Sequence, residues 1–371
     1  MLDSCDRHLL DIASNIQIES NFCIYHPNYQ PFALPNQLAE RFQKNPAPLQ
    51  QKYLTLLLRN FIYGIYYNGA LQRILALNAV REACRMTSPA SFLPHESIAN
   101  NSVLGIDKQL YQKLHNSNYG IGYFDQNWQV LRREPDGSLA VTKGGLTMHV
   151  ENVAFSPGNN QLRHLQSAQP GDKIDIWMPK NRLRNGCYVA VGNVGHKLQA
   201  NLDADLGKGR IYLNLTAAGA IALMESLTVE LNAAAIPFSF QVPYNYSAYG
   251  RYDSGVLYFE RNDYPLVREV LQSIYTQHKS HFRQEIPLFT KFLAPGVSFA
   301  EEPERKFVAQ ENFGMNRCQI VANALLEAWQ KGKNSPRERM EMICKHFADF
   351  GIDWRRPYLN PCSEDIYYPL T

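Results

Sequence analysis

Three arginines between residues 209 and 317 are the side chains best suited to chemistry in this sequence. Arg210 opens an alternating strand pattern that places it on one face with Tyr212 and Asn214. Arg251 and Arg317 follow in turn-rich and helix-opening segments, each close to an amide or a carboxylate. Guanidinium groups bind phosphate or carboxylate through two parallel hydrogen bonds. This composition predicts a pocket for an anion within the stretch.

Each arginine also has a purely structural alternative. Arg210 could pair with a carboxylate at the edge of a sheet, and Arg317 could cap or pair locally where a helix begins. Arg251 could pair with Asp253, two residues along the same strand face. These alternatives stay open at the level of the sequence.

Motifs for nucleotide, hydrolase and zinc chemistry are absent. The sequence has no GxGxxG after a strand, no GxxxxGK[ST], no GxSxG and no HExxH. His278 and His281 lack an acidic partner at metal-binding spacing, so an exposed helix face is favoured over a metal site. Glu301 and Glu302 could form an acid–base pair, but adjacent carboxylates in a proline-flanked loop are more often solvated. We expect no metal and no cofactor.

The net charge and the cysteines bear on the partners and the cellular compartment of the protein. A formal charge of +3 over 371 residues argues against partnership with nucleic acid or an anionic membrane. The seven cysteines are widely spaced, which is typical of free thiols in a reducing cytosol. The N-terminus lacks a signal-peptide pattern, and the most apolar short run, residues 54–58, is far too short to span a bilayer. We therefore expect a cytoplasmic protein.

Helical periodicity dominates the first part of the chain. Apolar residues recur at helical spacing over residues 1–85, most strongly over 51–67, with a looser proline-containing interruption at 25–35. Residues 88–118 are polar and irregular, which favours a boundary there. The sequence thus predicts an N-terminal helical subdomain over residues 1–100 and a second domain over 101–371.

Beyond the boundary the pattern changes to a period of two. Strand-and-turn patterns between 119 and 192 predict antiparallel hairpins. A helix with Thr216 as N-cap follows, then strands at 236–242 and 255–260, and helices at 264–278, 312–331 and 335–349. Strands in runs, with helices segregated from them, predict an α+β fold with a mostly antiparallel sheet.

The order of motifs from residue 119 to 350 resembles that of the HopA-type type III secretion effector family. The resemblance is densest between Gly209 and Cys318. The matching pieces are Lys143-Gly-Gly-Leu-Thr, Gly186-Cys-Tyr-Val-Ala-Val-Gly, Arg210-Ile-Tyr-Leu-Asn-Leu, Ile236-Pro-Phe, residues 249–258, residues 288–302 and Phe313-Gly-Met-Asn-Arg-Cys.

This resemblance implies a lyase that acts on phosphorylated peptides. Relatives outside pathogens belong to peptide-modifying pathways such as lanthipeptide biosynthesis, where a kinase-like partner phosphorylates Ser or Thr of a precursor peptide. The HopA-like protein then eliminates phosphate and leaves dehydroalanine or dehydrobutyrine. The implied partners are the phosphorylated peptide and a separate kinase.

Elimination needs cations for the phosphate, a base for the α-proton and a polarised carbonyl. Arg210, Arg251 and Arg317 are the candidates for binding phosphate. Asn214 and Asn316 are candidates for orienting the peptide backbone.

The candidates for proton transfer lie elsewhere in the chain. A lysine beside other cations holds its proton less tightly, which makes Lys143 or Lys291 a candidate base, and Lys291 also a fourth cation. His149, six residues after Lys143, is a candidate proton donor to the leaving phosphate.

One position departs from the pattern that the resemblance implies. A lysine is expected near the end of the strand that begins Ile236-Pro-Phe, and this chain has Gln241. Glutamine neither acts as a base nor neutralises phosphate. An alternative therefore stays open, a non-catalytic effector-like or phosphopeptide-binding protein, and a weaker one is a phosphate hydrolase.

Overall fold

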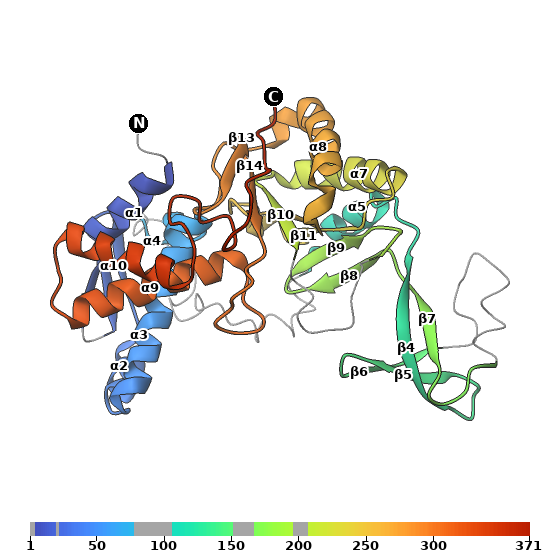
Figure 1. Cartoon of the computed structure of the whole chain (residues 1–371), viewed down its shortest axis with the longest axis horizontal. Coiled ribbons are helices and arrows are strands. Elements are labelled where there is room, and N and C mark those ends of the chain that lie inside the picture. The colour runs from blue at the N-terminus through green and yellow to red at the C-terminus, as the bar shows by residue number, and fades with distance from the viewer. Residues whose placement is uncertain (1–3, 20–21, 78–105, 151–166, 196–206) are drawn as a thin grey trace.

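The computed structural model describes residues 4–19, 22–77, 106–150, 167–195 and 207–371. Within these ranges the strands form three antiparallel sheets, and the helices are segregated from them (Figure 1). The predicted α+β class, with an N-terminal helical part, is confirmed. The predicted domain boundary near residue 100 lies outside the described residues and stays a prediction.

The described residues of the N-terminal part form four α-helices and a small sheet. The helices are α1 (Ser4–Asn15), α2 (Asn36–Gln43), α3 (Ala47–Ile62) and α4 (Gln72–Leu75), and a π-helical turn, η1 (Tyr63–Tyr67), continues α3. The interruption predicted as loose is instead an antiparallel sheet of β1 (Gln17–Glu19), β2 (Cys23–His26) and β3 (Tyr29–Ala33). Pro31 is tolerated because β3 is an edge strand, where a missing N–H costs little.

A first hydrophobic core joins the two ends of the chain. The buried stripe of α3, which includes Leu58 and Phe61, packs against α9 (Phe313–Gln330), and α1 packs against α10 (Pro336–Asp349). Figure 1 shows these helices gathered on one side of the molecule. Ser335 and Glu338 form a capping box that fixes the start of α10.

A four-stranded sheet projects from the opposite side (Figure 1). Its order is β6 (Leu146–Val150), β5 (Leu139–Lys143), β4 (Tyr123–Arg133) and β7 (Lys173–Met178). It has its own small core around Trp128 and Val141. This is the meander predicted from the period-two pattern. Helix α5 (Lys108–Asn116) precedes it.

The central sheet has seven antiparallel strands. Their order is β13 (Lys291–Ala294), β14 (Val297–Glu301), β10 (Lys208–Leu213), β12 (Gly255–Glu260), β11 (Phe238–Pro243), β9 (Cys187–Val191) and β8 (Asn181–Arg184). The order in space differs from the order along the chain. Segments distant in the sequence therefore become neighbours.

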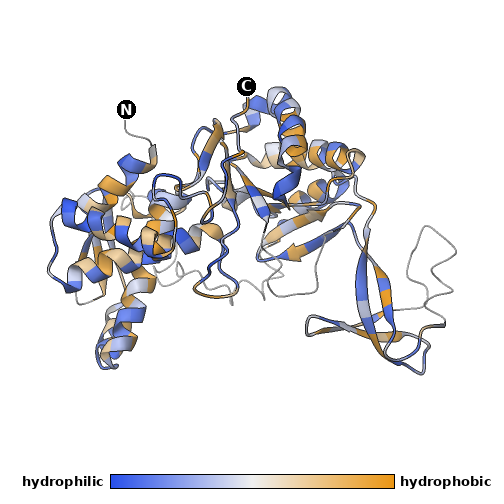
Figure 2. Cartoon of the chain, in the orientation of Figure 1, coloured by the Kyte–Doolittle hydropathy of each residue, from blue (hydrophilic) through white to orange (hydrophobic). Residues whose placement is uncertain are grey.

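The two faces of this sheet differ in character. Successive side chains of a strand point to opposite faces. Ile211, Leu257 and Phe240 lie in register on one face and form a second core with α7 (Ala217–Ala233) and α8 (Tyr264–His278). Figure 2 shows the largely hydrophobic colouring of α7 above the sheet. The opposite face, which we call the polar face, carries Arg210 and Tyr258 in register.

Two further features concern the whole described chain. Among the described residues, no helix combines the length and apolarity needed to cross a membrane. The cysteines in these ranges are all free thiols, and Cys84 lies outside them.

Candidate anion-binding site

The polar face of the central sheet carries a pocket of about 260 Å³. It extends from β8 to the loop that precedes α9. Five cationic side chains line it, and they outnumber its three carboxylates. The cations are Arg182, Arg184, Lys208, Arg210 and Lys306, and the carboxylates are Glu260, Glu302 and Glu311.

Arg210 is held firmly inside this pocket. Its guanidinium pairs with the carboxylate of Glu302 and lies 4.8 Å from the ring centre of Tyr258. Stacking on an aromatic face attracts a cation, most strongly where water is excluded. Only 12% of the Arg210 side chain is exposed. Burial raises the pKa of the Tyr258 hydroxyl, which therefore keeps its proton at neutral pH.

Glu301 and Glu302 are not solvated, contrary to the sequence-based expectation. Both side chains are 2% exposed. The two neighbours point to opposite faces of the sheet, so they do not form an acid–base pair. Glu302 faces the pocket, where Lys306 lies 2.7 Å from its carboxylate in addition to Arg210.

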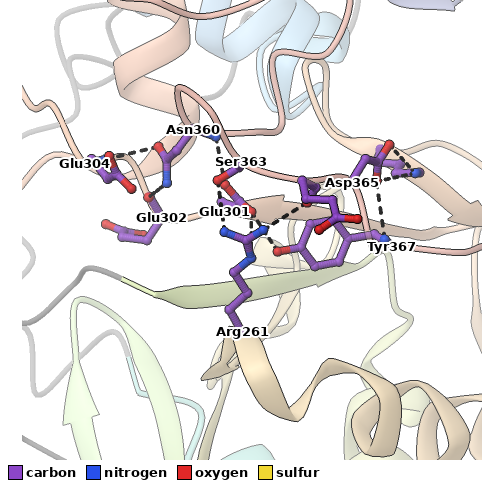
Figure 3. Close-up of polar contacts among 10 residues, drawn as sticks. Arg261, Glu301, Glu302, Glu304, Asn360, Ser363, Asp365 and Tyr367 are labelled. Atoms are coloured by element: carbon purple, nitrogen blue, oxygen red, sulfur yellow. Dashed lines mark hydrogen bonds and ion pairs between the residues drawn. The ribbon is translucent and has the colours of Figure 1, made fainter.

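Glu301 lies in a separate polar cluster with the C-terminal segment (Figure 3). Its carboxylate accepts hydrogen bonds from the Tyr367 hydroxyl at 2.7 Å and the Asn360 backbone at 2.8 Å. Arg261 lies 3.2 Å away. The C-terminal segment is thereby fixed across the sheet, which makes this cluster structural.

Gln241, the position where the resemblance implies a lysine, lines the same pocket. Its amide oxygen accepts a weak hydrogen bond of 3.4 Å from Tyr258, and it is hydrogen-bonded to the Cys187 thiol. Burial raises the pKa of Cys187, so this thiol is neutral. The side chain that distinguishes this chain from the expected pattern thus contacts the hydroxyl of Tyr258, the residue on whose ring Arg210 stacks.

Arg251 pairs with Asp253, which is the structural alternative that the sequence left open. Two of its nitrogens each donate to the Asp253 carboxylate at 2.8 Å. The Tyr63 hydroxyl donates to the same carboxylate at 3.4 Å. Arg251 does not line the pocket.

Arg317 and Asn316 are buried in the first turn of α9. Arg317 is 1% exposed and donates to the carbonyls of Pro357 and Leu359 and to the amide oxygen of Asn316. Asn316 donates to the Arg305 carbonyl and to the carboxylate of Glu311. Burial lowers the pKa of Arg317 to about 10. The structure therefore uses both residues to anchor α9, away from the surface of the pocket.

Asn214 and Lys291 also lie outside the pocket. Asn214 is buried after β10 and donates to the Glu285 carbonyl at 2.9 Å. Lys291, on the outer strand β13, lies 2.6 Å from the carboxylate of Asp365 and 5.4 Å from the ring centre of Tyr358. It links the edge of the sheet to the C-terminal segment.

Lys143 and His149 belong to the projecting four-stranded sheet. Lys143 lies 2.6 Å from Asp125, and His149, 57% exposed, lies 3.6 Å from Glu134. The register pairs Lys143 with Leu146 and His149 with Ala140, which places the two side chains on opposite faces. Of the eight residues expected in the site, only Arg210 lines the pocket.

Sequence reasoning missed the other four cations of the pocket. Arg182 and Arg184 alternate along Asn181-Arg-Leu-Arg, just before an Asn-Gly turn, and Lys208 stands two residues before Arg210. Both patterns place cations on one strand face and could have been noticed. Lys306 lies in the loop between β14 and α9, where no strand periodicity indicates the direction of its side chain.

In the part of the chain that the structure describes, no group of three or more His, Cys, Asp or Glu side chains could hold a metal ion. His278 instead lies 3.0 Å from the Ser226 hydroxyl.

The fold and the pocket define an α+β protein with a cationic site on the polar face of an antiparallel sheet. Residues 178–359 match the HopA1 effector protein family, and this part of the chain belongs to it. The resemblance expected from the sequence is thus confirmed there, while the Lys143-Gly-Gly-Leu-Thr piece lies outside the match. The pocket lies inside it.

Two effector proteins are among the solved structures that are similar to this chain. One is an effector protein from Pseudomonas syringae pv. tomato strain DC3000, with 15% identity, a TM-score of 0.39 and coverage of 69% of this chain and 82% of that one. The other is an effector protein from Pseudomonas syringae pv. syringae strain 61, with 18% identity, a TM-score of 0.35 and coverage of 47% and 63%. No curated protein matches this chain.

Proposed function

We propose that this protein is a phospho-Ser/Thr lyase, which binds a phosphorylated peptide in the pocket and eliminates phosphate to leave dehydroalanine or dehydrobutyrine. The observation that supports it most is the excess of cations in a pocket built around Arg210. A phosphorylated side chain carries nearly two negative charges at neutral pH. The family match over residues 178–359 is consistent with the proposal, since the resemblance implies this chemistry.

The chemistry requires a balanced set of bond changes. A base removes the Cα proton, the released electron pair forms the Cα–Cβ double bond, and the Cβ–O bond breaks as phosphate leaves with its electrons. In our proposal Arg210 binds the phosphate and stabilises its growing charge. The Tyr258 hydroxyl, protonated because burial raises its pKa, donates to the leaving oxygen.

The base is drawn from the amines that line the pocket. Lys208 and Lys306 are the two such residues, and Lys208 is the more suitable, because the Lys306 ammonium is ion-paired with Glu302 at 2.7 Å. Glu302 is the less suitable base, because its carboxylate is already paired with Arg210 and Lys306. Lys143, Lys291 and His149 have no part in this mechanism.

A separate kinase supplies the phosphorylated peptide in this proposal. The sequence has neither a GxxxxGK[ST] motif nor a GxGxxG after a strand, the loops with which NTPases and protein kinases bind nucleotide phosphates. The kinase and the precursor peptide remain the proposed partners.

A second function, binding of a phosphopeptide without catalysis, is favoured by one observation. Gln241 puts an uncharged amide in the pocket at the position where the resemblance implies a lysine. Compared with a pocket that has a lysine at this position, this pocket has one group fewer for proton transfer. Its five cations remain for binding phosphate.

Trapping with a thiol tests elimination directly. A phosphothreonine peptide is incubated with the protein and then treated with a small thiol, which adds only to a dehydro residue. An adduct supports the lyase. Release of phosphate without an adduct indicates hydrolysis, and an unchanged but bound peptide indicates the binding function.

A further inference from the structure

The carbonyl of the phosphorylated residue has no partner yet in the proposed elimination. Removal of the Cα proton leaves an electron pair that the adjacent carbonyl oxygen takes up as an enolate. A hydrogen-bond donor fixed beside that oxygen stabilises the developing charge. Asn214 and Asn316, which the sequence suggested for the peptide backbone, are buried and do not line the pocket.

Asn312 is an asparagine that does line the pocket. It is the N-cap of α9, and its Oδ1 accepts a hydrogen bond of 2.8 Å from the Met315 backbone. This contact identifies the capping atom as the oxygen, because a backbone N–H can only donate. The Nδ2 group, with its two N–H donors, is therefore the other end of the amide.

The hydroxyl of Tyr63 supports this orientation. It is hydrogen-bonded to the Asn312 side chain, and it donates its own proton to Asp253 at 3.4 Å. Since the hydroxyl proton is used on Asp253, the Tyr63 oxygen accepts from Asn312 Nδ2. Among the described residues, none accepts the second N–H of this amide. Asn312 thus offers the pocket one oriented donor.

The Asn312 amide lies on the Arg210 side of the pocket. Phe313, the next residue, packs against Tyr212 with ring centres 6.3 Å apart. Tyr212 is two residues from Arg210 on the same strand face. The loop that ends at Asn312 begins at Glu302, the carboxylate partner of Arg210. Both ends of this loop are therefore held against the strand that carries the phosphate-binding arginine.

Glu311, the residue before Asn312, fixes the loop from within. One oxygen of its carboxylate accepts hydrogen bonds of 2.9 Å from the Phe307 backbone and from the Asn316 side chain. The side chain of Asn312 is thus held by its cap contact and its Tyr63 contact, and its backbone by the neighbouring anchor. A donor that does not have to reorganise is the kind that stabilises developing charge well.

We propose that Asn312 is a further catalytic residue, whose second N–H donates to the carbonyl oxygen of the phosphorylated residue. This inference rests on the proposed function and assigns a role that the mechanism requires. The Cα–H bond breaks, its proton passes to the base, and the electron pair moves onto the carbonyl oxygen beside Asn312. The pair then returns to form the Cα–Cβ double bond as the Cβ–O bond breaks and phosphate leaves.

Tyr63 is the positioning residue for this amide. It lies in the π-helical turn η1, so the N-terminal helical part contributes to a site on the central sheet. In our proposal its hydroxyl affects the reaction through Asn312, which it holds in place.

Asn312→Ser tests the catalytic role, since serine caps a helix about as well as asparagine but has no amide. We expect kcat for a phosphothreonine peptide to fall by about 10²-fold with KM nearly unchanged. Asn312→Asp, which keeps the capping oxygen, should show at least the same loss, and it replaces the serine variant if that one unfolds. Ser335→Asn, at the N-cap of α10 outside the pocket, is the matched control and should keep wild-type kinetics.

A double-mutant cycle tests the positioning role. Tyr63→Phe removes the hydroxyl and should lower kcat by about fivefold in an otherwise wild-type protein. In the Asn312→Ser background the same change should have no further effect on kcat, because the amide that it positions is gone. Equal losses in both backgrounds would show that Tyr63 acts independently of Asn312.

The two levels of the account fail in different ways. A wild-type kcat in both Asn312 variants, or a rise in KM alone, would overturn the role of Asn312 while the lyase stands. No elimination by the wild-type protein would overturn the proposed function and this role with it.

Discussion

The guanidinium of Arg210 lies 4.8 Å above the ring of Tyr258, and the register of β10 and β12 places these residues directly opposite each other. Glu302 pairs with the same guanidinium from the neighbouring β14 side. Arg210 is thus fixed before any ligand binds. A cation that does not have to reorganise stabilises developing charge more effectively than a mobile one.

Loss of Arg210 should affect turnover much more than loss of a similar arginine on the other face. Arg210→Ala should lower kcat/KM for a phosphothreonine peptide by about 10²-fold or more, because it removes a charge-stabilising donor. Arg261→Ala is the control, since Arg261 pairs with the adjacent Glu301 away from the pocket. Similar losses in both variants would show that the effect is on folding.

Arg210→Ala also leaves Glu302 buried with one cation fewer. Unfolding in urea should therefore show a lower stability for this variant. The double variant Arg210→Met/Glu302→Gln should recover stability without recovering turnover. Recovery of turnover as well would remove Arg210 from the mechanism.

Tyr258→Phe should separate binding from proton donation. The ring remains under Arg210 while the hydroxyl is lost, so we expect kcat to fall by roughly 10²-fold with KM nearly unchanged. Steady-state kinetics over a range of peptide concentrations measure both. A rise in KM alone would show that the hydroxyl only binds substrate.

Gln241→Lys should strengthen the binding of phosphate. The new ammonium would lie in the pocket near Tyr258, and a charged donor binds an anion more tightly than an amide, by about tenfold. Fluorescence anisotropy with a labelled phosphopeptide measures the change. Gln277→Lys, on the exposed side of α8, is the control. Weaker binding by Gln241→Lys would contradict a phosphate site at this end.

Arg317→Met should destabilise the protein without a specific effect on the pocket. The change leaves two backbone carbonyls and the Asn316 amide oxygen without their donor, which costs about 3 kcal/mol in total. Urea unfolding measures the loss. Phosphopeptide affinity of the folded variant at low temperature should match that of wild type, and a selective loss of affinity would return Arg317 to the site.

Acid should destabilise the contact between α9 and α10 through Glu327. Hydrogen bonds from Lys331 and His346 hold the pKa of Glu327 at about 2, below its ordinary value of 4.5. The carboxylate form is favoured by folding, so its contribution is fully present above pH 4.5 and is lost as pH falls towards 2. Unfolding free energies of Glu327→Gln should therefore depend less on pH between 5 and 2 than those of wild type. Equal pH slopes would contradict the assignment.

Local sequence patterns predict many of the individual elements. The helix predicted over 264–278 is α8, and the strand predicted over 255–260 is β12. Thr216 caps α7 as predicted, accepting a hydrogen bond from Gly219. These features depend on periodicity and capping, which are properties of neighbouring residues.

The composition of the site depends on strand order, which local patterns do not determine. Arg182 and Arg210 line one pocket because β8 and β10 belong to the same sheet, where they are joined through β9, β11 and β12. This order in space differs from the order of the strands along the chain. The pairing of Lys291 with Asp365 likewise joins residues that are 74 positions apart in the chain. Residue type alone therefore indicated an anion pocket and one of its cations, Arg210.

The most direct measurement is mass spectrometry of a phosphothreonine peptide incubated with purified protein, without metal and without a kinase. We predict loss of the mass of phosphoric acid with wild-type protein, and with the Arg261→Ala control, but not with Arg210→Lys, whose single ammonium cannot form the bidentate contact. A peptide that keeps its mass with wild-type protein, or one that loses phosphoric acid equally fast with Arg210→Lys, would contradict elimination in this pocket.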